Sequence, residues 1–535
     1  MRYAFFWLLW AAASASGLAR FHLGLIDRAA LRNGGAEERD ASSVEQLYSR
    51  QLLTFGRESQ MRIGAGHVVV YGAHGVGLEV SKNLVLAGVK SVSIVDDAGV
   101  EASDLGSHFY AVSDRMGSRG TQSIAGIQDL NGLCRVKSVS AAGDASLEAI
   151  ECGAYDCVVC CQGAAVAVAV NEACRRAAIR VPFVWVRCVG ARFLVFDDFG
   201  DDFPVADREL HGAAAEPSLL EPLVEEATGL YLLRTAGDRE RHEAADGDRL
   251  ELDAAGGDGG LALVVNEVIT PHALRATVVS GCVDPCLRYS ARVIPALRIV
   301  KQRKLVEALR AERVVASVDG VGASRNLLMR LIAVENPALG CVAAVAGGVA
   351  AHDCLKALTG GILGGPVSGQ FLYHNALMHT PLHEFTLNGG CRYAAARNCF
   401  GDVGLKHLRE STVFVVGAGA TGCEILKNIV LLGVSTVYVA DDDAIELSNL
   451  SRQFLYRDAD VGLNKATTAK QAIDGLRSDT KVIAMPRRVN VDSCRTTFDD
   501  SFWCGIDLVF TALDSVEARL YLDSICVARE IPLVD

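Results

Sequence analysis

The segment "VFVVGAGATGCEILKN", Val413–Asn428, predicts a buried strand that runs into a glycine-rich turn and then into a helix. Gly417, Gly419 and Gly422 have a spacing that lets a backbone approach a phosphate at a helix N-terminus. A similar segment, "VVVYGAHGVGLEVSKN", lies at Val68–Asn83 with His74 in place of the second glycine. The chain therefore carries this turn twice, and one glycine is missing from the first copy.

The two turns belong to a longer repeat. Gly72 matches Gly417, and 13 of the 26 positions from Gly72 to Asp97 are identical to their partners. Each copy reads as strand, turn and helix, with the helix ending at Gly88 or Gly433, before a second strand ending in acids. This pattern predicts an α/β protein with two related, doubly wound nucleotide-binding domains.

Composition narrows the class of protein. The chain has 535 residues, enough for two to four domains, and half of them are apolar. A formal net charge of −12 argues against a general nucleic-acid binder. The 17 cysteines have no regular spacing, so we expect no disulfide framework, and we interpret Cys157 and Cys160 as buried apolar residues.

The remaining segments differ in character. Residues 195–289 combine acidic runs with short strands and predict a small, mostly-β insertion, which "RIVKQRKLVEALRAERVV" follows as a predicted helical stretch. The apolar run "CVAAVAGGVAAHDCLKAL" predicts a core helix, so no stable membrane span is expected. Residues 1–43 have the form of a signal or targeting segment, which suggests secretory-route or plastid targeting. A mis-assigned start codon is the alternative.

The residues after the second turn indicate its ligand. Asp441 ends the second strand, where an acid can accept hydrogen bonds from ribose, and to this point an NAD-dependent oxidoreductase fits equally well. The following stretch adds cations and amides suited to a triphosphate, which disfavours NAD. These candidate phosphate ligands are Asn449, Arg452, Gln453 and Lys465. Asp514 and Asp443 are candidate Mg²⁺ ligands.

The same positions of the first copy have lost this chemistry. The residues there are His74, Asp104, Ser107, His108 and Gly120. We therefore predict that the first copy is inactive as a nucleotide site and that the second copy is active.

Several long motifs resemble the eukaryotic ubiquitin-activating enzyme over residues 44–535. They include "YSRQLLTFG", "GAHGVGLEVSKNLVLAGVKSV", "AVAGGVAAHDCLKALTGG" and "SNLSRQFLYRDADVG". The resemblance implies two ThiF-type halves. Residues 44–194 would begin the inactive half and 195–289 would be the first catalytic-cysteine half-domain. Residues 290–400 would form a short helical segment and the return of the inactive half, and 401–535 would be the active half.

The resemblance also implies roles for single residues. Asp441 would hold ribose, the glycine turn and Asn449, Arg452, Gln453 and Lys465 would hold the phosphates of ATP, and Asp514 would bind Mg²⁺. Arg50 would reach the triphosphate from the inactive half, so Arg50, Arg452 and Asp514 are the predicted catalytic residues. The ubiquitin C-terminal carboxylate would attack the α-phosphorus, giving an acyl-adenylate and pyrophosphate.

The chain departs from this family in places. Leu463 stands where lysine is usual, and the sequence stops at "IPLVD", before the family's thioester cysteine domain. We therefore expect adenylation at most, and a ubiquitin-conjugating enzyme as partner only with the missing part. A non-catalytic ubiquitin-binding scaffold is an alternative. By family, the protein would lie in the cytoplasm and nucleus.

Overall fold

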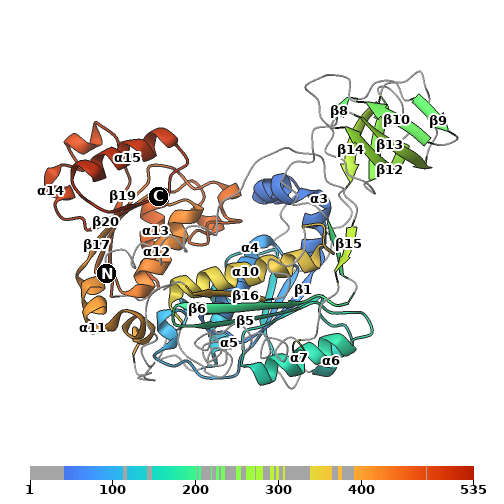
Figure 1. Ribbon diagram of the computed structural model, residues 1–535. Coiled ribbons are helices and arrows are strands. Elements are labelled where there is room, and N and C mark those ends of the chain that lie inside the picture. Colours follow the sequence, from blue (N-terminus) through green and yellow to red (C-terminus); the bar gives the residue numbers. More distant parts are fainter. Residues whose placement is uncertain are drawn as a thin grey trace, which may run out of the picture.

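A computed structural model describes most of the chain (Figure 1). The described residues are 41–111, 117–140, 147–201, 338–363, 371–375, 391–476 and 479–535, with separate strands and short pieces between 203 and 307. The predicted targeting segment lies outside them, apart from residues 41–43. These three residues begin the helix α2 (Ala41–Leu47) and so belong to the first half.

The first half is built on a sheet whose central part is parallel. Its strands in spatial order are β16 (Phe371–Asn375), β6 (Arg192–Asp198), β5 (Phe183–Val189), β4 (Cys157–Cys160), β1 (His67–Tyr71), β2 (Ser91–Val95) and β3 (Arg135–Ser138). Strand β6 pairs antiparallel with both β5 and β16, and the other pairs are parallel. Helices α4 (Gly75–Ala87) and α10 (Gly340–Leu358) lie on one face, and α6 (Leu147–Glu151) and α7 (Ala164–Arg176) on the other (Figure 1).

The second half repeats the core of this sheet. Its order is β19 (Lys481–Met485), β18 (Thr436–Ala440), β17 (Thr412–Val416), β20 (Leu508–Thr511) and β21 (Leu533–Val534), and every pair is parallel. This is the order β3, β2, β1, β4, β5 of the first half, with the first strand at the centre. The prediction of two related, doubly wound domains is confirmed.

The glycine turns and their helices fold as predicted. Helices α4 and α12 (Ala420–Leu432) follow β1 and β17, and both end at a left-handed glycine, Gly88 or Gly433. The repeat also extends further upstream than the sequence comparison found. Helices α3 (Ser49–Ala65) and α11 (Ala394–Glu410) are each kinked at a left-handed glycine, Gly56 and Gly401, which are also one repeat apart.

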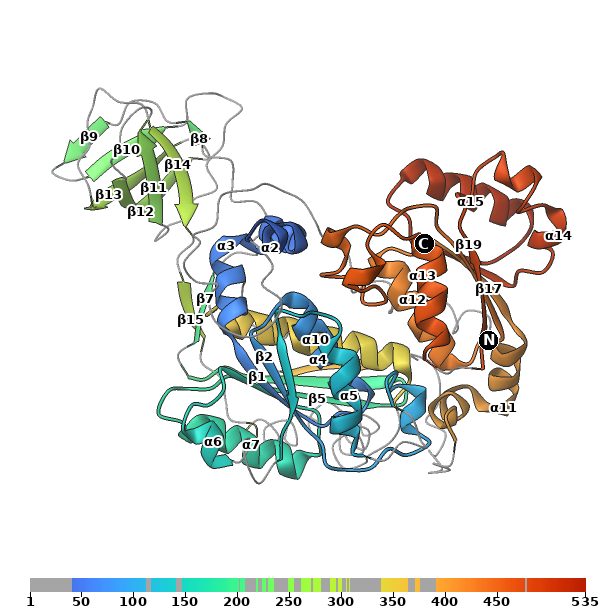
Figure 2. The same cartoon turned by 180° about the vertical axis from the view of Figure 1, so that it is seen from behind.

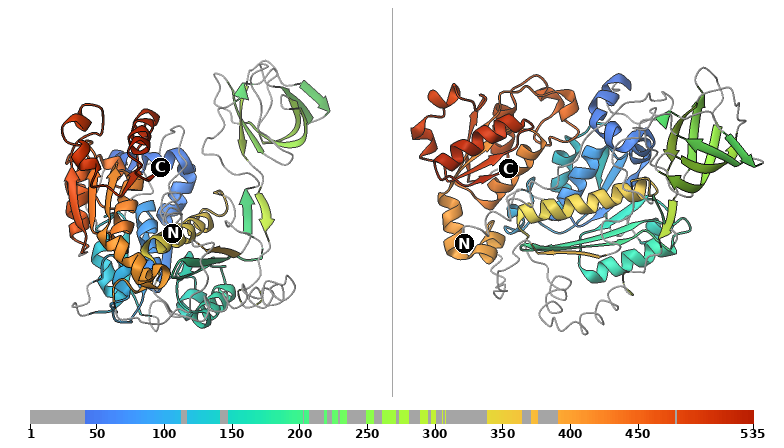
Figure 3. Two further views of the ribbon diagram at one scale, coloured as in Figure 1. Left: turned by 60° about the vertical axis from the view of Figure 1, so that its left-hand side comes forward. Right: turned by 45° about the horizontal axis from the view of Figure 1, so that its top comes forward.

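One hydrophobic core joins the two halves. Buried residues of α4, α10 and α12 belong to the same cluster, in which Leu84, Ala346 and Ile429 are fully or almost fully buried. Helix α10 is the predicted core helix. It is also the single helix among the described residues long and apolar enough to cross a membrane, and 67% of its apolar window is buried inside the protein. Figure 3 shows it running across the first sheet.

The two candidate redox cysteines are buried on opposite faces of one strand. Cys157 of β4 belongs to the core shared by the halves, whereas Cys160 belongs to the core beneath α7. Burial raises the pKa of the Cys160 thiol to about 12. Since alternate strand positions face opposite ways, the pair cannot act as one site. Their interpretation as buried apolar residues agrees with this placement.

The insertion is mostly β, as predicted, and stands apart from both halves (Figure 2). Its sheet contains β8 (Ser218–Leu219), β14 (Tyr289–Ile294), β11 (Arg249–Ala254), β12 (Leu261–Thr270), β13 (Ala273–Ser280), β10 (Leu230–Arg234) and β9 (Val224–Ala227). The ribbon of β7 (Phe203–Ala206) and β15 (Leu297–Val300) precedes and follows that sheet along the chain.

The pairing of these strands corrects three expectations. The boundary at 195 divides β6, which belongs to the first sheet, and the boundary at 289 detaches β14 from the insertion's sheet. The acidic composition that suggested the first boundary begins inside β6. The stretch predicted as helical from Arg298 is also wrong at its start, because Arg298–Val300 pair with β7. Most of the rest of that stretch lies outside the described residues.

Candidate active site

The second glycine turn places its three glycines in different surroundings. Gly417 has a φ of +101°, and a Cβ there would lie 2.4 Å from the carbonyl oxygen of Ala512. A Cβ at Gly422 would lie 2.0 Å from the carbonyl oxygen of Gly417. At Gly419, the nearest atom would be the Nε2 of Gln453, at 4.0 Å. Gly417 and Gly422 are therefore required by the turn itself, whereas Gly419 faces open space.

Asp441 is held at the edge of this turn. Its carboxylate accepts hydrogen bonds from the backbone nitrogens of Ala418, at 2.7 Å, and Asp443, at 2.8 Å. Burial raises the pKa of Asp441 from its ordinary value. Each oxygen accepts one of these backbone bonds and retains a second lone pair, so the side chain can still accept from a ribose hydroxyl.

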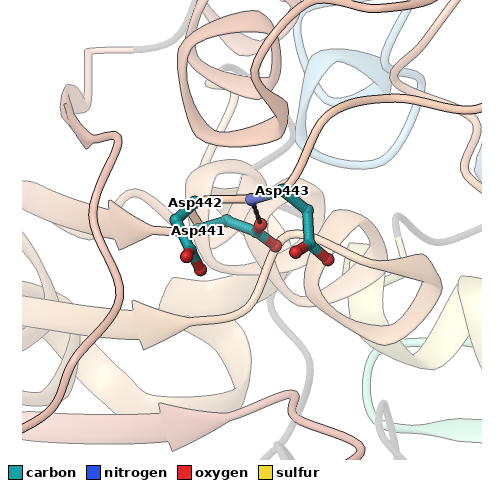
Figure 4. A group of neighbouring side chains, drawn as sticks. All are labelled: Asp441, Asp442 and Asp443. Carbon is teal, nitrogen blue, oxygen red and sulfur yellow. Dashed lines mark hydrogen bonds between the residues drawn. The ribbon is translucent and has the colours of Figure 1, made fainter.

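Three consecutive carboxylates gather at this strand end (Figure 4). One oxygen of each of Asp441, Asp442 and Asp443 lies within 4.8 Å of the others. The Nζ of Lys465 binds Asp443 at 2.8 Å, and Arg488 pairs with Asp442. The predicted phosphate ligand Lys465 and the predicted metal ligand Asp443 are thus ion-paired with each other. Asp514 is exposed and does not belong to this group.

The loop between β18 and α13 (Lys465–Asp474) carries the amide side chains. Asn449 accepts a hydrogen bond from the backbone nitrogen of Glu446, which caps the short helix η3 (Leu447–Asn449). Gln453 is 4% exposed, and its Oε1 has no hydrogen-bond partner among the described residues. An unsatisfied buried amide oxygen is costly, and it can only accept a hydrogen bond. The Nε2 of the same amide is the atom that lies over Gly419, and it can donate to a phosphate oxygen at the turn.

Two arginines from different halves interact through their charges at this loop. Burial, followed by the charge of Arg50 on α3, lowers the pKa of Arg452. Arg452 donates to the carbonyl oxygen of Ser448 at 2.5 Å. Among the described residues, neither arginine forms an ion pair with a carboxylate. Two such cations favour a polyanion between them.

Two supporting residues were missed by the sequence analysis. The hydroxyl of Tyr456 donates to the carbonyl oxygen of Ala418 at 2.7 Å and lies 3.2 Å from that of Lys465, so it joins the turn to the start of α13. Arg457 donates to the carbonyl oxygen of Phe454 at 2.7 Å and to the hydroxyl of Tyr110 at 3.3 Å. Both lie within the quoted motif "SNLSRQFLYRDADVG", but their partners Ala418 and Tyr110 are distant in sequence and gave no local signal.

The first copy keeps the turn but fills the corresponding space. Asp96 accepts from the backbone nitrogen of Ala73 at 2.8 Å, as Asp441 does from Ala418. Here, however, Arg119 forms ion pairs with Asp96, at 3.0 Å, and with Asp104, at 3.3 Å. His74 is half-buried near these charges, and burial, followed by the charge of Arg119, lowers its pKa. The guanidinium of Arg119 is thus already bound to the carboxylate of Asp96.

The reciprocal arginine is also absent from the first copy. One repeat after Arg50, the residue on α11 is Ala395, which is 5% exposed. The first half therefore brings a cation to the second site, while the second half has only a methyl group at the equivalent position. This supports the prediction that the first copy is inactive.

The sequence matches the ThiF family over residues 48–393 and again over 392–535. It is 30% identical to ubiquitin-activating enzyme E1 1 of Arabidopsis thaliana, across 92% of this chain and 51% of that protein. It is 29% identical to ubiquitin-like modifier-activating enzyme 6 of Homo sapiens, across 92% and 52%. The chain spans about half the length of these curated relatives.

Among solved structures, the E. coli tRNA N6-threonylcarbamoyladenosine dehydratase TcdA in complex with ATP is 24% identical over 26% of this chain and 57% of its own. The TM-score is 0.25, too low to support an argument.

Proposed function

Because the chain belongs to the ThiF family and carries its domain twice, we propose that it activates the C-terminus of ubiquitin, or of a ubiquitin-like modifier, by ATP-dependent adenylation. The observation that carries the proposal is the geometry of the second glycine turn, where Gly419 faces open space beneath the Gln453 amide and Ala418 holds the carboxylate of Asp441. The names of the curated relatives support the substrate class.

The reaction requires positioning and charge neutralisation. An oxygen of the modifier's terminal carboxylate attacks the α-phosphorus, the bond to the bridging oxygen of the leaving group breaks, and pyrophosphate departs. Asp441 would orient the ribose, and the turn with Gln453 would hold phosphate oxygens. Arg50 and Arg452 would stabilise the charge that grows on the leaving pyrophosphate. The substrate supplies the nucleophile, so no protein nucleophile is needed.

Carboxylates near the turn suit Mg²⁺, which prefers oxygen ligands. We propose Asp443 and Asp514 as its ligands, and bound Mg²⁺ would neutralise phosphate charge. Because Lys465 is paired with Asp443, the two residues would exchange partners when a nucleotide is bound, with Lys465 turning towards phosphate.

Modifier-dependent ATP–pyrophosphate exchange tests the proposal. The full chain with ATP, Mg²⁺ and ubiquitin should incorporate labelled pyrophosphate into ATP, and ubiquitin without its terminal glycine should give none. Binding of ubiquitin without exchange would instead support the scaffold. Tight NAD binding with hydride transfer would support an oxidoreductase. Either result would refute adenylation of ubiquitin by this chain.

A further inference from the structure

Four buried charges lie between the helices that follow the two glycine turns. They are Glu79 and Lys82 of α4 and their repeat partners Glu424 and Lys427 of α12. Each lysine pairs with both glutamates, including Lys82 with Glu79 at 2.9 Å and Lys427 with Glu424 at 2.7 Å. The two cations and two anions form a closed, neutral set, which we call the interhelix tetrad.

The tetrad lies deep in the interface between the halves. The side chains of Glu79, Lys82 and Lys427 are at most 1% exposed. A Cβ at Gly347 of α10 would lie 2.5 Å from the Cβ of Glu79, so α10 packs closely over the tetrad. Charges buried this deeply are costly unless their partners are in place. The geometry of one half therefore depends on the presence of the other.

The lysines also contact aromatic rings, and this contact is not symmetric. The Nζ of Lys82 lies 4.7 Å from the ring centre of Phe454, and that of Lys427 lies 5.3 Å from it. Lys427 also lies 5.1 Å from the ring of Phe109, the repeat partner of Phe454. Among the described residues, both ammonium groups lie over the active copy's ring, and Lys82 has no such contact with Phe109.

Phe454 directly follows Gln453, the residue whose unsatisfied amide lies over Gly419. Its ring is 2% exposed and packs edge-to-face on Phe109, with ring centres 5.9 Å apart. Its carbonyl oxygen accepts from Arg457, which also donates to Tyr110 of the first half. The segment that carries Arg452 and Gln453 is therefore anchored on the silent half by a ring and by a guanidinium.

We propose that Lys82 of the silent copy is a positioning residue for the active copy's nucleotide site, acting through the ring of Phe454. The ammonium group of Lys82 holds the negative face of the ring, and the ring sets the position of the adjacent Gln453 and Arg452. The silent half then contributes the Lys82–Phe454 contact to this loop. This inference rests on the proposed function for its effect on ATP, but not for its effect on the loop.

The test uses the full chain and removes one cation and one anion, so that the tetrad stays neutral and only the Lys427–Glu424 pair remains. In the variant Glu79→Gln/Lys82→Met, backbone amides of residues 449–456 should exchange hydrogen about tenfold faster in the absence of nucleotide. ATP should bind about tenfold more weakly by calorimetry. Lys82→Arg keeps the cation over the ring and should restore most of both properties.

A matched control separates positioning from general destabilisation. Lys356 pairs with Asp353 at 3.4 Å with the same spacing on α10, and both are buried. Asp353→Asn/Lys356→Met should lower Tm comparably, yet leave loop exchange and ATP affinity within about twofold of the parent. Equal effects of the two double variants on the loop, or an unchanged loop in Glu79→Gln/Lys82→Met, would overturn the proposal.

A Phe454→Leu background tests the route of the effect. If Lys82 acts through the ring, adding Glu79→Gln/Lys82→Met to Phe454→Leu should weaken ATP binding no further. If the two changes instead lower ATP affinity by independent factors, the ring of Phe454 does not transmit the effect of Lys82. If the parent chain binds no ATP at all, the proposed function fails. Hydrogen exchange of residues 449–456, compared between Glu79→Gln/Lys82→Met and Asp353→Asn/Lys356→Met, still decides the role of Lys82.

Discussion

The two glycine turns differ in what occupies the space above the same backbone. Both keep the glycines that the turn requires, and both hold an aspartate by a backbone nitrogen. Above the second turn lie open space at Gly419 and the Gln453 amide, whose oxygen has no hydrogen-bond partner in the part of the chain that the structure describes. Arg452 follows in the same loop and forms no ion pair with a described carboxylate. Above the first lie an imidazole and an arginine already paired with two carboxylates.

This comparison teaches which positions belong to the fold and which to the ligand. The glycine missing from the first copy corresponds to Gly419, where an added Cβ would approach no backbone atom closely. Asp104, which replaces Asn449, still accepts a backbone bond, from Glu101 at 2.9 Å, and so keeps the capping role. The first copy has lost its ligand-facing groups, while its structural groups and its contacts with the other half remain.

Substituting the arginine of the active copy should have the largest effect. Arg452→Ala removes the cation that we propose neutralises the leaving group, and we expect about 10²-fold slower pyrophosphate exchange. The matched change Ser107→Ala in the silent copy should leave the rate within about twofold. Similar losses in both variants would show that the silent copy also takes part in the chemistry.

Exchanging the residue that differs between the turns should abolish one site without creating another. Gly419→His places an imidazole in the open space, and we expect ATP affinity to fall about 100-fold, measured by calorimetry. His74→Gly should not produce a second ATP site, because Arg119 still holds Asp96. A second bound ATP in His74→Gly would contradict the view that this ion pair closes the first site.

Equivalent losses of a cation should have opposite consequences in the two copies. Arg119→Gln leaves Asp96, which is 3% exposed, without its partner, and should cost about 3 kcal/mol of unfolding free energy with no change in ATP affinity. Lys465→Gln breaks a pair with the exposed Asp443 and should cost at most about 1 kcal/mol. It should nevertheless weaken ATP binding about tenfold. Urea unfolding measures the unfolding free energy, and calorimetry measures ATP affinity. If Arg119→Gln weakened ATP binding and Lys465→Gln did not, the nucleotide site would lie in the first copy.

The smallest effect concerns the acid sensitivity of the silent copy. Burial lowers the pKa of His108 to about 4, whereas an unfolded histidine titrates near 6.5. The unfolded state therefore binds a proton that the folded state does not, and stability falls as pH drops from about 6.5 towards 4. His108→Gln, the residue of the active copy, should remove about 2 kcal/mol of the loss between about pH 7 and pH 5. Equal losses in the parent and the variant, by urea unfolding, would refute this.

The amino-acid sequence was enough to predict the repeated strands, the turns and the helices ending at Gly88 and Gly433. It also showed that the candidate phosphate ligands are replaced in the first copy. Each is encoded within a few consecutive residues, by apolar periodicity, by glycine conformation or by charge. The candidate ligands of the second copy could be named for the same reason, since most follow one strand in order.

Which charges meet could be seen only in the folded chain. There Arg119 pairs with Asp96 and Asp104, and Lys82 lies over Phe454 of the other half. The tertiary structure also moved the insertion's boundaries, because strand pairing rather than composition assigns β6 and β14 to their sheets. These contacts join residues far apart in the chain, and their strength depends on burial and distance, which no local pattern records.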